Sequence, residues 1–91
     1  MSQPVYEGGN KTNITSTTTV TPVSGNNAIL VGIFVAQATS TPTLKVADSS
    51  ATIANTFTPV AGTFYPMPCS LSGAVTVTIS GTVDCTMFWT N

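Results

Sequence analysis

Few side chains in this 91-residue sequence could perform catalysis or bind a metal ion. Histidine is absent, which removes the commonest general base and excludes serine–histidine and cysteine–histidine nucleophile pairs. The carboxylates are Glu7, Asp48 and Asp84. A glycosidase-like pair needs two carboxylates about 5–10 Å apart across a cleft, and a calcium site needs two or three acidic ligands in one loop. Asp48 and Asp84 could meet, but we favour a solvated turn residue and a separate residue on a strand face.

The two cysteines, Cys69 and Cys85, are too few for a zinc site, which takes about four ligands. They also fall short of the disulfide framework of a small secreted domain, so we favour buried free thiols over a disulfide. No glycine-rich phosphate loop precedes a helix. We therefore predict no catalytic residues, no metal and no cofactor, and a protein that is not an enzyme.

Charged residues make up only 5% of the chain, and the net charge is −1. Nucleic-acid binding needs several Lys or Arg side chains to neutralise phosphates, and only Lys11 and Lys45 are present, so we expect none. The longest apolar run, residues 28–36, is too short for a membrane-spanning helix of about 20 residues. Residues 1–7 have neither a basic nor an apolar segment, so we expect no secretory signal there. A surface of so little charge favours association, as a homo-oligomer or a docked subunit.

Aromatic side chains are the remaining candidates for a binding site. Phe64, Tyr65, Phe88 and Trp89 could stack on a sugar ring or on a partner, although Phe and Trp more often form a core or a subunit interface. Near the N-terminus, apolar side chains could anchor the chain to a neighbouring subunit. The partner-binding candidates are Val5, Tyr6, Tyr65 and Trp89.

The elements that would position these side chains are strands. In residues 74–89 apolar and polar residues alternate with period 2, which is typical of half-buried antiparallel strands. We interpret this stretch as a hairpin that turns at Gly81-Thr82, with Val75, Val77 and Ile79 on one face of its first strand. On its second strand the apolar face comprises Val83, Cys85, Met87 and Trp89.

The rest of the chain shows the same spacing of short strands and turns, with prolines that suit edge strands. We expect strands at about 13–21, 28–36 (with Gly32 as a bulge or close contact), 43–47, 51–54, 57–60 and 63–67. The polar segments 38–42 and 48–50 are predicted as a loop and a turn. The predicted fold is all-β, an antiparallel β-sandwich of jelly-roll type with seven or eight short strands. Residues 1–12 are predicted as a flexible N-terminal arm and residues 13–91 as a single domain.

The segment from Phe64 onward resembles a known family. It comprises an aromatic-Pro-x-Pro segment, then Leu-Ser-Gly-Ala-Val-Thr-Val, then Ser-Gly-Thr-Val-Asp-Cys-Thr-Met-Phe-Trp. This order is similar to the C-terminal half of small β-sandwich proteins encoded in the structural modules of tailed phages. The likeness covers about the last thirty residues well and residues 28–60 loosely. Cys85 stands where that family usually has an aliphatic residue, and Trp89 where Tyr is common.

This resemblance implies a virion component, a capsid decoration or cement protein that binds the major capsid protein on the outside of the head, often as a homotrimer. It would be assembled in the host cytoplasm and reside on the capsid surface, and the resemblance brings no catalytic residues. The alternative is a receptor-binding or carbohydrate-binding β-module of a phage tail or spike that uses Tyr65 or Trp89.

Overall fold

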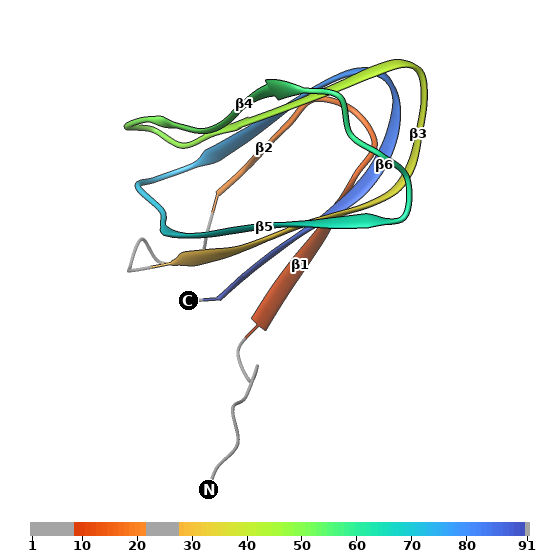
Figure 1. Cartoon of the computed structure of the whole chain (residues 1–91). Coiled ribbons are helices and arrows are strands. Elements are labelled where there is room, and N and C mark those ends of the chain that lie inside the picture. The colour runs from red at the N-terminus through yellow and green to blue at the C-terminus, as the bar shows by residue number, and fades with distance from the viewer. Residues whose placement is uncertain (1–8, 22–27, 91) are drawn as a thin grey trace, which may run out of the picture.

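The computed structural model describes residues 9–21 and 28–90, and every regular element in these ranges is a β-strand. The strands are β1 (Gly9–Ile14), β2 (Thr18–Val20), β3 (Ile29–Ala47), β4 (Thr52–Phe57), β5 (Thr63–Ser70) and β6 (Val75–Thr90). All pairings are antiparallel and join the six strands into one sheet (Figure 1). The all-β prediction is confirmed. No helix in the described part of the chain could cross a membrane.

Two long strands form the centre of the sheet. β3 and β6 pair along almost their whole length, from Ile29 opposite Thr90 to Ala47 opposite Thr76. Near the middle, between Thr39 and Thr43, the pairing register shifts and both strands bend sharply. Because β3 and β6 bend at the same level, the sheet folds over across its middle.

Each half of the folded sheet has its own pair of outer strands. β5 pairs with the first half of β3, and β1 pairs with the second half of β6, which lies next to it. β4 and β2 take the same positions beyond the bend. The predicted strands 28–36 and 43–47 are therefore the two halves of β3, and the described residues form six strands. The predicted strand 57–60 is wrong, because β4 ends at Phe57. Because the six strands belong to one folded sheet, the predicted sandwich or jelly-roll arrangement is not confirmed.

The predicted hairpin at Gly81-Thr82 is wrong. Residues 75–90 form the single strand β6, which changes direction at Gly81 without reversing. Gly81 has a φ of 76°, and a Cβ atom there would lie 2.5 Å from the carbonyl oxygen of Ser40. Ser40 and Thr41 themselves have positive φ angles of 62° and 57°. The polar segment 38–42, predicted as a loop, is thus the bent middle of β3.

The N-terminal prediction also needs correction. β1 begins at Gly9, and Gly9 to Thr12 pair with Thr90 to Met87 of β6, so this part of segment 1–12 is strand. Residues 1–8 lie outside the described ranges. The predicted strand 13–21 corresponds to the end of β1 and to β2, two edge segments along β6.

The inner face of the folded sheet forms one apolar core. The predicted alternation of β6 is confirmed, because Val75, Val77, Val83, Cys85 and Met87 are all buried. From the other strands the core receives Ile14, Val20, Leu30, Ile33, Val35, Leu44 and Val46. Ala28 and Leu71, next to the ends of β3 and β5, and Trp89 of β6 complete it. Both cysteines are free, and the Cys85 thiol lies 3.5 Å from the carbonyl oxygen of Ile14, which accepts its hydrogen bond.

Candidate functional site

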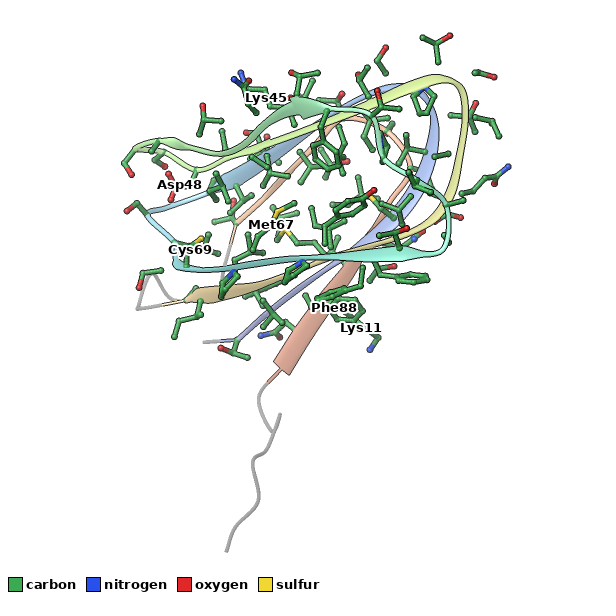
Figure 2. All side chains as sticks on the ribbon, in the orientation of Figure 1. Lys11, Lys45, Asp48, Met67, Cys69 and Phe88 are labelled. Carbon is green, nitrogen blue, oxygen red and sulfur yellow. The ribbon has the colours of Figure 1, made fainter. Side chains whose placement is uncertain are left out.

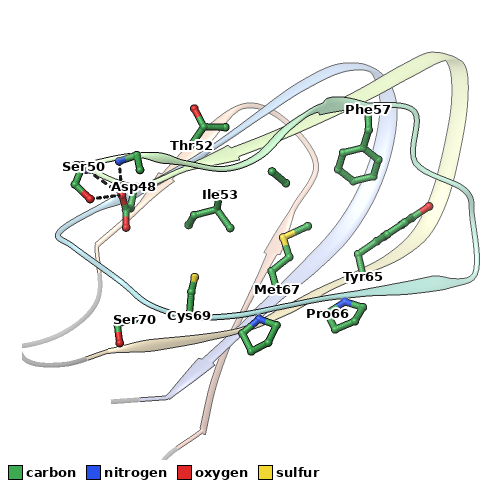
Figure 3. A pocket seen from close by; sticks show the side chains of 13 residues that line it. Asp48, Ser50, Thr52, Ile53, Phe57, Tyr65, Pro66, Met67, Cys69 and Ser70 are labelled. Carbon is green, nitrogen blue, oxygen red and sulfur yellow. Dashed lines mark hydrogen bonds between the residues drawn. The ribbon is translucent and has the colours of Figure 1, made fainter.

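A groove lies between β4 and β5, where the two halves of the folded sheet diverge (Figure 3). Its volume is about 640 Å³. The two strands both pair with β3, one on each side of the bend, so their inner side chains face each other across the groove. Apolar side chains line most of it: Ile53, Ala54, Phe57, Tyr65 and Met67, with Cys69 at one end. The groove is therefore a half-open part of the core.

Tyr65 is fixed at the wall of this groove. Its ring meets that of Phe57 edge to face, with centroids 5.0 Å apart and an interplanar angle of 61°. Its hydroxyl oxygen accepts a hydrogen bond of 2.9 Å from the backbone N–H of Val60. Two contacts from two directions hold the ring in one position, so Tyr65 forms a rigid surface of the groove.

Asp48 lies at the same end of the groove as Cys69, away from Tyr65, and joins two turns (Figure 3). One carboxylate oxygen accepts hydrogen bonds of 2.9 Å from the backbone N–H groups of Ser50 and Ala51, and the other accepts one of 3.0 Å from Ser72. These donors, with Ser50 the strongest, lower the pKa of the Asp48 carboxyl, because they favour its charged form. Asp48 is thus a structural carboxylate in the predicted turn 48–50.

The two thiols are poor nucleophiles in this setting. Burial, and then the nearby charge of Asp84, raises the pKa of the Cys85 thiol to about 11. Partial burial, and then the charge of Asp48, raises the pKa of the Cys69 thiol as well. Both thiols therefore remain protonated at neutral pH. In the described ranges no three His, Cys, Asp or Glu side chains group closely enough to hold a metal ion.

A second candidate surface covers the outer side of the half-sheet formed by β1, β6, β3 and β5. Large apolar side chains emerge here: Phe34 is 38% exposed, Phe64 42% and Ile29 45%. Phe88 and Val31 are half-buried beside them and, with Phe64 and Lys11, border a hollow of about 490 Å³. We name Ile29, Val31, Phe34, Phe64 and Phe88 the outer aromatic face. Figure 2 shows Lys11 next to Phe88 on this side of the sheet.

Gly32 provides the space for this face. A Cβ atom at Gly32 would lie 2.6 Å from the Phe64 ring and 2.5 Å from the carbonyl oxygen of Tyr65. The missing side chain lets the Phe64 ring lie over the sheet, with its centroid 6.4 Å from that of Phe88. The register of β3 shifts between Leu30 and Gly32 against both neighbouring strands, so the bulge expected at Gly32 is present.

The structure describes two of the four partner-binding residues that the sequence suggested, Tyr65 and Trp89. Trp89 is only 6% exposed and belongs to the core, so its ring is not available for stacking, and its indole N–H has no hydrogen-bond partner among the described residues. Tyr65 lies in the groove, on the other side of the sheet from Phe64. Val5 and Tyr6 fall outside the described ranges. The structure therefore brings none of these four residues together in a described site.

Phe34 is the exposed aromatic residue that the sequence did not suggest. It lies in the apolar run 28–36, which is typical of a strand buried on both faces, so nothing marked it as exposed. The register explains its position, because Phe34 pairs with both Phe64 and Thr86 and thus shares the outer side with them.

Comparisons of the chain with protein-family models, curated proteins and solved structures found no match. Evidence about function therefore comes from the two surfaces themselves. One is a groove with a fixed tyrosine, and the other is an outer sheet face with three phenylalanine side chains.

Proposed function

We propose that this protein is a structural subunit of a tailed-phage virion that decorates the capsid and stabilises the head through contacts with the major capsid protein. The observation that carries the proposal is the outer aromatic face. Exposed apolar side chains gathered on one sheet face are typical of protein interaction sites, and aromatic residues are enriched there. A sheet is a suitable support, because it presents Phe34, Phe64 and Phe88 on a backbone that is already ordered, which lowers the entropy cost of binding.

The virion setting is supported by the sequence resemblance of the segment from Phe64 onward to small phage β-sandwich proteins. Both ends of that segment contribute to the outer aromatic face, through Phe64 on β5 and Phe88 on β6. The low charge of the chain fits a subunit whose role is adhesion. A cement protein also needs no reactive groups, and both thiols of this chain are protonated at neutral pH.

Binding to phage heads tests this function. We would prepare heads that lack the protein from the phage carrying its gene, add purified protein and measure the bound fraction by co-sedimentation. The variant F34S/F64S should bind at least tenfold more weakly, because central aromatic side chains dominate interface energies. The control is V60S, which removes another exposed apolar side chain, 59% exposed, from the loop between β4 and β5.

Two results would speak against the proposal. One is a wild-type protein that fails to bind the heads at all. The other is equal binding by F34S/F64S and V60S, with circular dichroism confirming that both variants keep the β-sheet spectrum.

The groove favours a second candidate, a receptor-binding or carbohydrate-binding module of a phage tail or spike. Its supporting observation is the fixed Tyr65 ring, which could stack on a sugar. Sugar sites also need several free polar groups, whereas the Tyr65 hydroxyl and the Asp48 carboxylate already have partners within the chain. This function therefore ranks second. Saturable binding on a glycan array that Y65A abolishes would support it over the cement function.

A further inference from the structure

Two charged side chains of opposite sign lie on the same side of the sheet as the outer aromatic face, four residues apart along the strands. Lys11 is exposed on β1 and pairs with Phe88 of β6. Asp84 lies on the same side of β6, four residues from Phe88, and accepts a hydrogen bond of 2.8 Å from the Asn13 side chain. At about 3.3 Å per residue along a strand, the two charges lie roughly 13 Å apart along the sheet.

Phe34 and Phe64 lie level with the midpoint between these charges along the strands, whereas Phe88 lies level with Lys11. The row of paired residues halfway between Lys11 and Asp84 consists of Asn13, Thr86, Phe34 and Phe64, taken across β1, β6, β3 and β5. Along the strands there is thus a row with the positive charge of Lys11, a central row with two exposed phenylalanines, and a row with the negative charge of Asp84, while Ile29 lies beyond the Lys11 row, opposite Thr90. Such an order is self-complementary. When a second copy is rotated by 180° about the central row and laid face to face on the first, its Asp84 row lies opposite the Lys11 row of the first copy.

We propose that the outer aromatic face binds a second copy of this chain as a two-fold dimer, with Lys11 of each copy against Asp84 of the other. The two-fold axis lies along the central row, so Phe34 and Phe64 pack against the same residues of the partner. In a two-fold interface every contact occurs twice, which is why one Lys and one Asp give two ion pairs. This inference rests on the proposed function: the dimer covers the adhesive face in the free protein, and it opens before the same face binds the capsid.

The charges set the register of the dimer, and the phenylalanines supply most of its affinity. Exposed ion pairs contribute little each and are screened by salt. Burial of exposed aromatic surface at the centre of an interface contributes more. A face of four strands is at the small end of specific interfaces, so the dimer should be weak enough to exchange. Analytical ultracentrifugation over a wide range of protein concentrations therefore measures it best.

Charge reversal gives a test that a structural role cannot imitate. In K11E both ion pairs of the dimer become repulsions, and the same holds for D84K, so each variant alone should self-associate about tenfold more weakly than the wild type. An equimolar mixture of K11E and D84K should form a heterodimer, because each acid then faces a lysine. The double variant K11E/D84K should recover self-association.

The control is K45E, which makes the same charge change on β3 beyond the bend, where Lys45 pairs with Thr78. It should leave self-association unchanged. Unchanged association of K11E and D84K, a mixture that does not form heterodimers, or a trimer as the associated species would each overturn the two-fold pairing.

Failure of this inference and failure of the proposed function give different results. If F34S/F64S loses binding to heads while charge reversal has no effect on self-association, the face binds the capsid and the pairing is wrong. If the mixture forms heterodimers while the wild type fails to bind heads, the pairing stands and the capsid function is wrong.

Discussion

The bend of the sheet makes Gly81 the most sensitive position of the backbone. A Cβ atom at Gly81 would approach the carbonyl oxygens of Ser40 and Thr41 to 2.5 and 2.8 Å, and the Cα atom of Pro42 to 3.0 Å. These are backbone atoms that cannot rotate away. The φ angle of 76° adds a second penalty, because side chains other than hydrogen disfavour this region. G81A therefore combines two independent costs.

The size of the effect follows from these two costs. The left-handed conformation costs about 1–2 kcal/mol for alanine, and forcing a methyl group into a filled space costs about 1–3 kcal/mol. We expect G81A to lower the free energy of unfolding by about 2–5 kcal/mol, against a total of about 5–14 kcal/mol for a domain of this size. G81A is thus expected to lose a large part of the stability of the fold.

Two other glycines separate the costs. Gly62 has a φ of 79°, but no atom lies within 4 Å of the place that a methyl group would take there, so G62A tests the conformation alone. Gly32 has close backbone neighbours without a positive φ, so G32A tests the contact alone. All three changes reduce the entropy of the unfolded chain by the same amount, a stabilisation of about 0.4–1 kcal/mol that enters once for G81A and twice for the sum of G62A and G32A.

Urea unfolding followed by the fluorescence of Trp89, the single tryptophan and a core residue, measures these free energies. The loss in G81A should exceed the sum of the losses in G62A and G32A by about 0.4–1 kcal/mol, the unfolded-state term that the sum counts twice. A loss in G81A equal to that in G62A would refute the close backbone contact at the bend. It would then follow that β3 and β6 do not pack closely against each other at Gly81.

Two further predictions concern titrating groups. Because the pKa of Asp48 is lowered in the folded state, its hydrogen bonds stabilise the protein above the ordinary carboxyl pKa of about 4 and lose this effect as the pH falls below it. D48N should therefore be less stable than the wild type at pH 7, and its urea midpoint should vary less between pH 5 and pH 2. Parallel pH profiles of the two proteins would contradict the role of Asp48. Because Cys85 is buried and the pKa of its thiol is raised, iodoacetamide at pH 8 should alkylate Cys85 more slowly than Cys69. Peptide mass spectrometry measures both rates, and equal rates would show that the core opens readily.

Much of the local structure could be predicted from the sequence. The alternation in residues 75–90 identified the buried side of β6 correctly, and the turn at 48–50 and the bulge at Gly32 are present. These features depend on neighbouring residues, so a local pattern is sufficient to find them. The prolines of β5 also lie in an edge strand, as their missing N–H groups require.

The hairpin error had a detectable signal. In a hairpin with a two-residue loop at 81–82, Ser80 would face Val83 and Thr78 would face Cys85, so polar and apolar side chains would share a face. In a continuous strand, all the odd-numbered residues from Val75 to Trp89 keep to one side. The second arrangement agrees with the sequence pattern and is the one observed.

The position of the aromatic residues could not be predicted in the same way. In β5 both faces carry large apolar groups, with Phe64 and Pro66 on one and Tyr65 and Met67 on the other, so the period of two left the choice open. The choice depends on Gly32, which lies more than thirty residues away and makes room for the Phe64 ring only after β3 and β5 have paired.

By itself, the sequence determined that this protein is built of strands, which side of β6 is buried and that reactive groups are few, because each of these follows from residue type and short-range spacing. Only the tertiary structure decided that β3 and β6 bend together, that Trp89 is in the core and that Phe34 and Phe64 share an exposed face. These outcomes depend on which distant segments pair and in what register, and the strand pairs β3–β5 and β3–β6 supply that information.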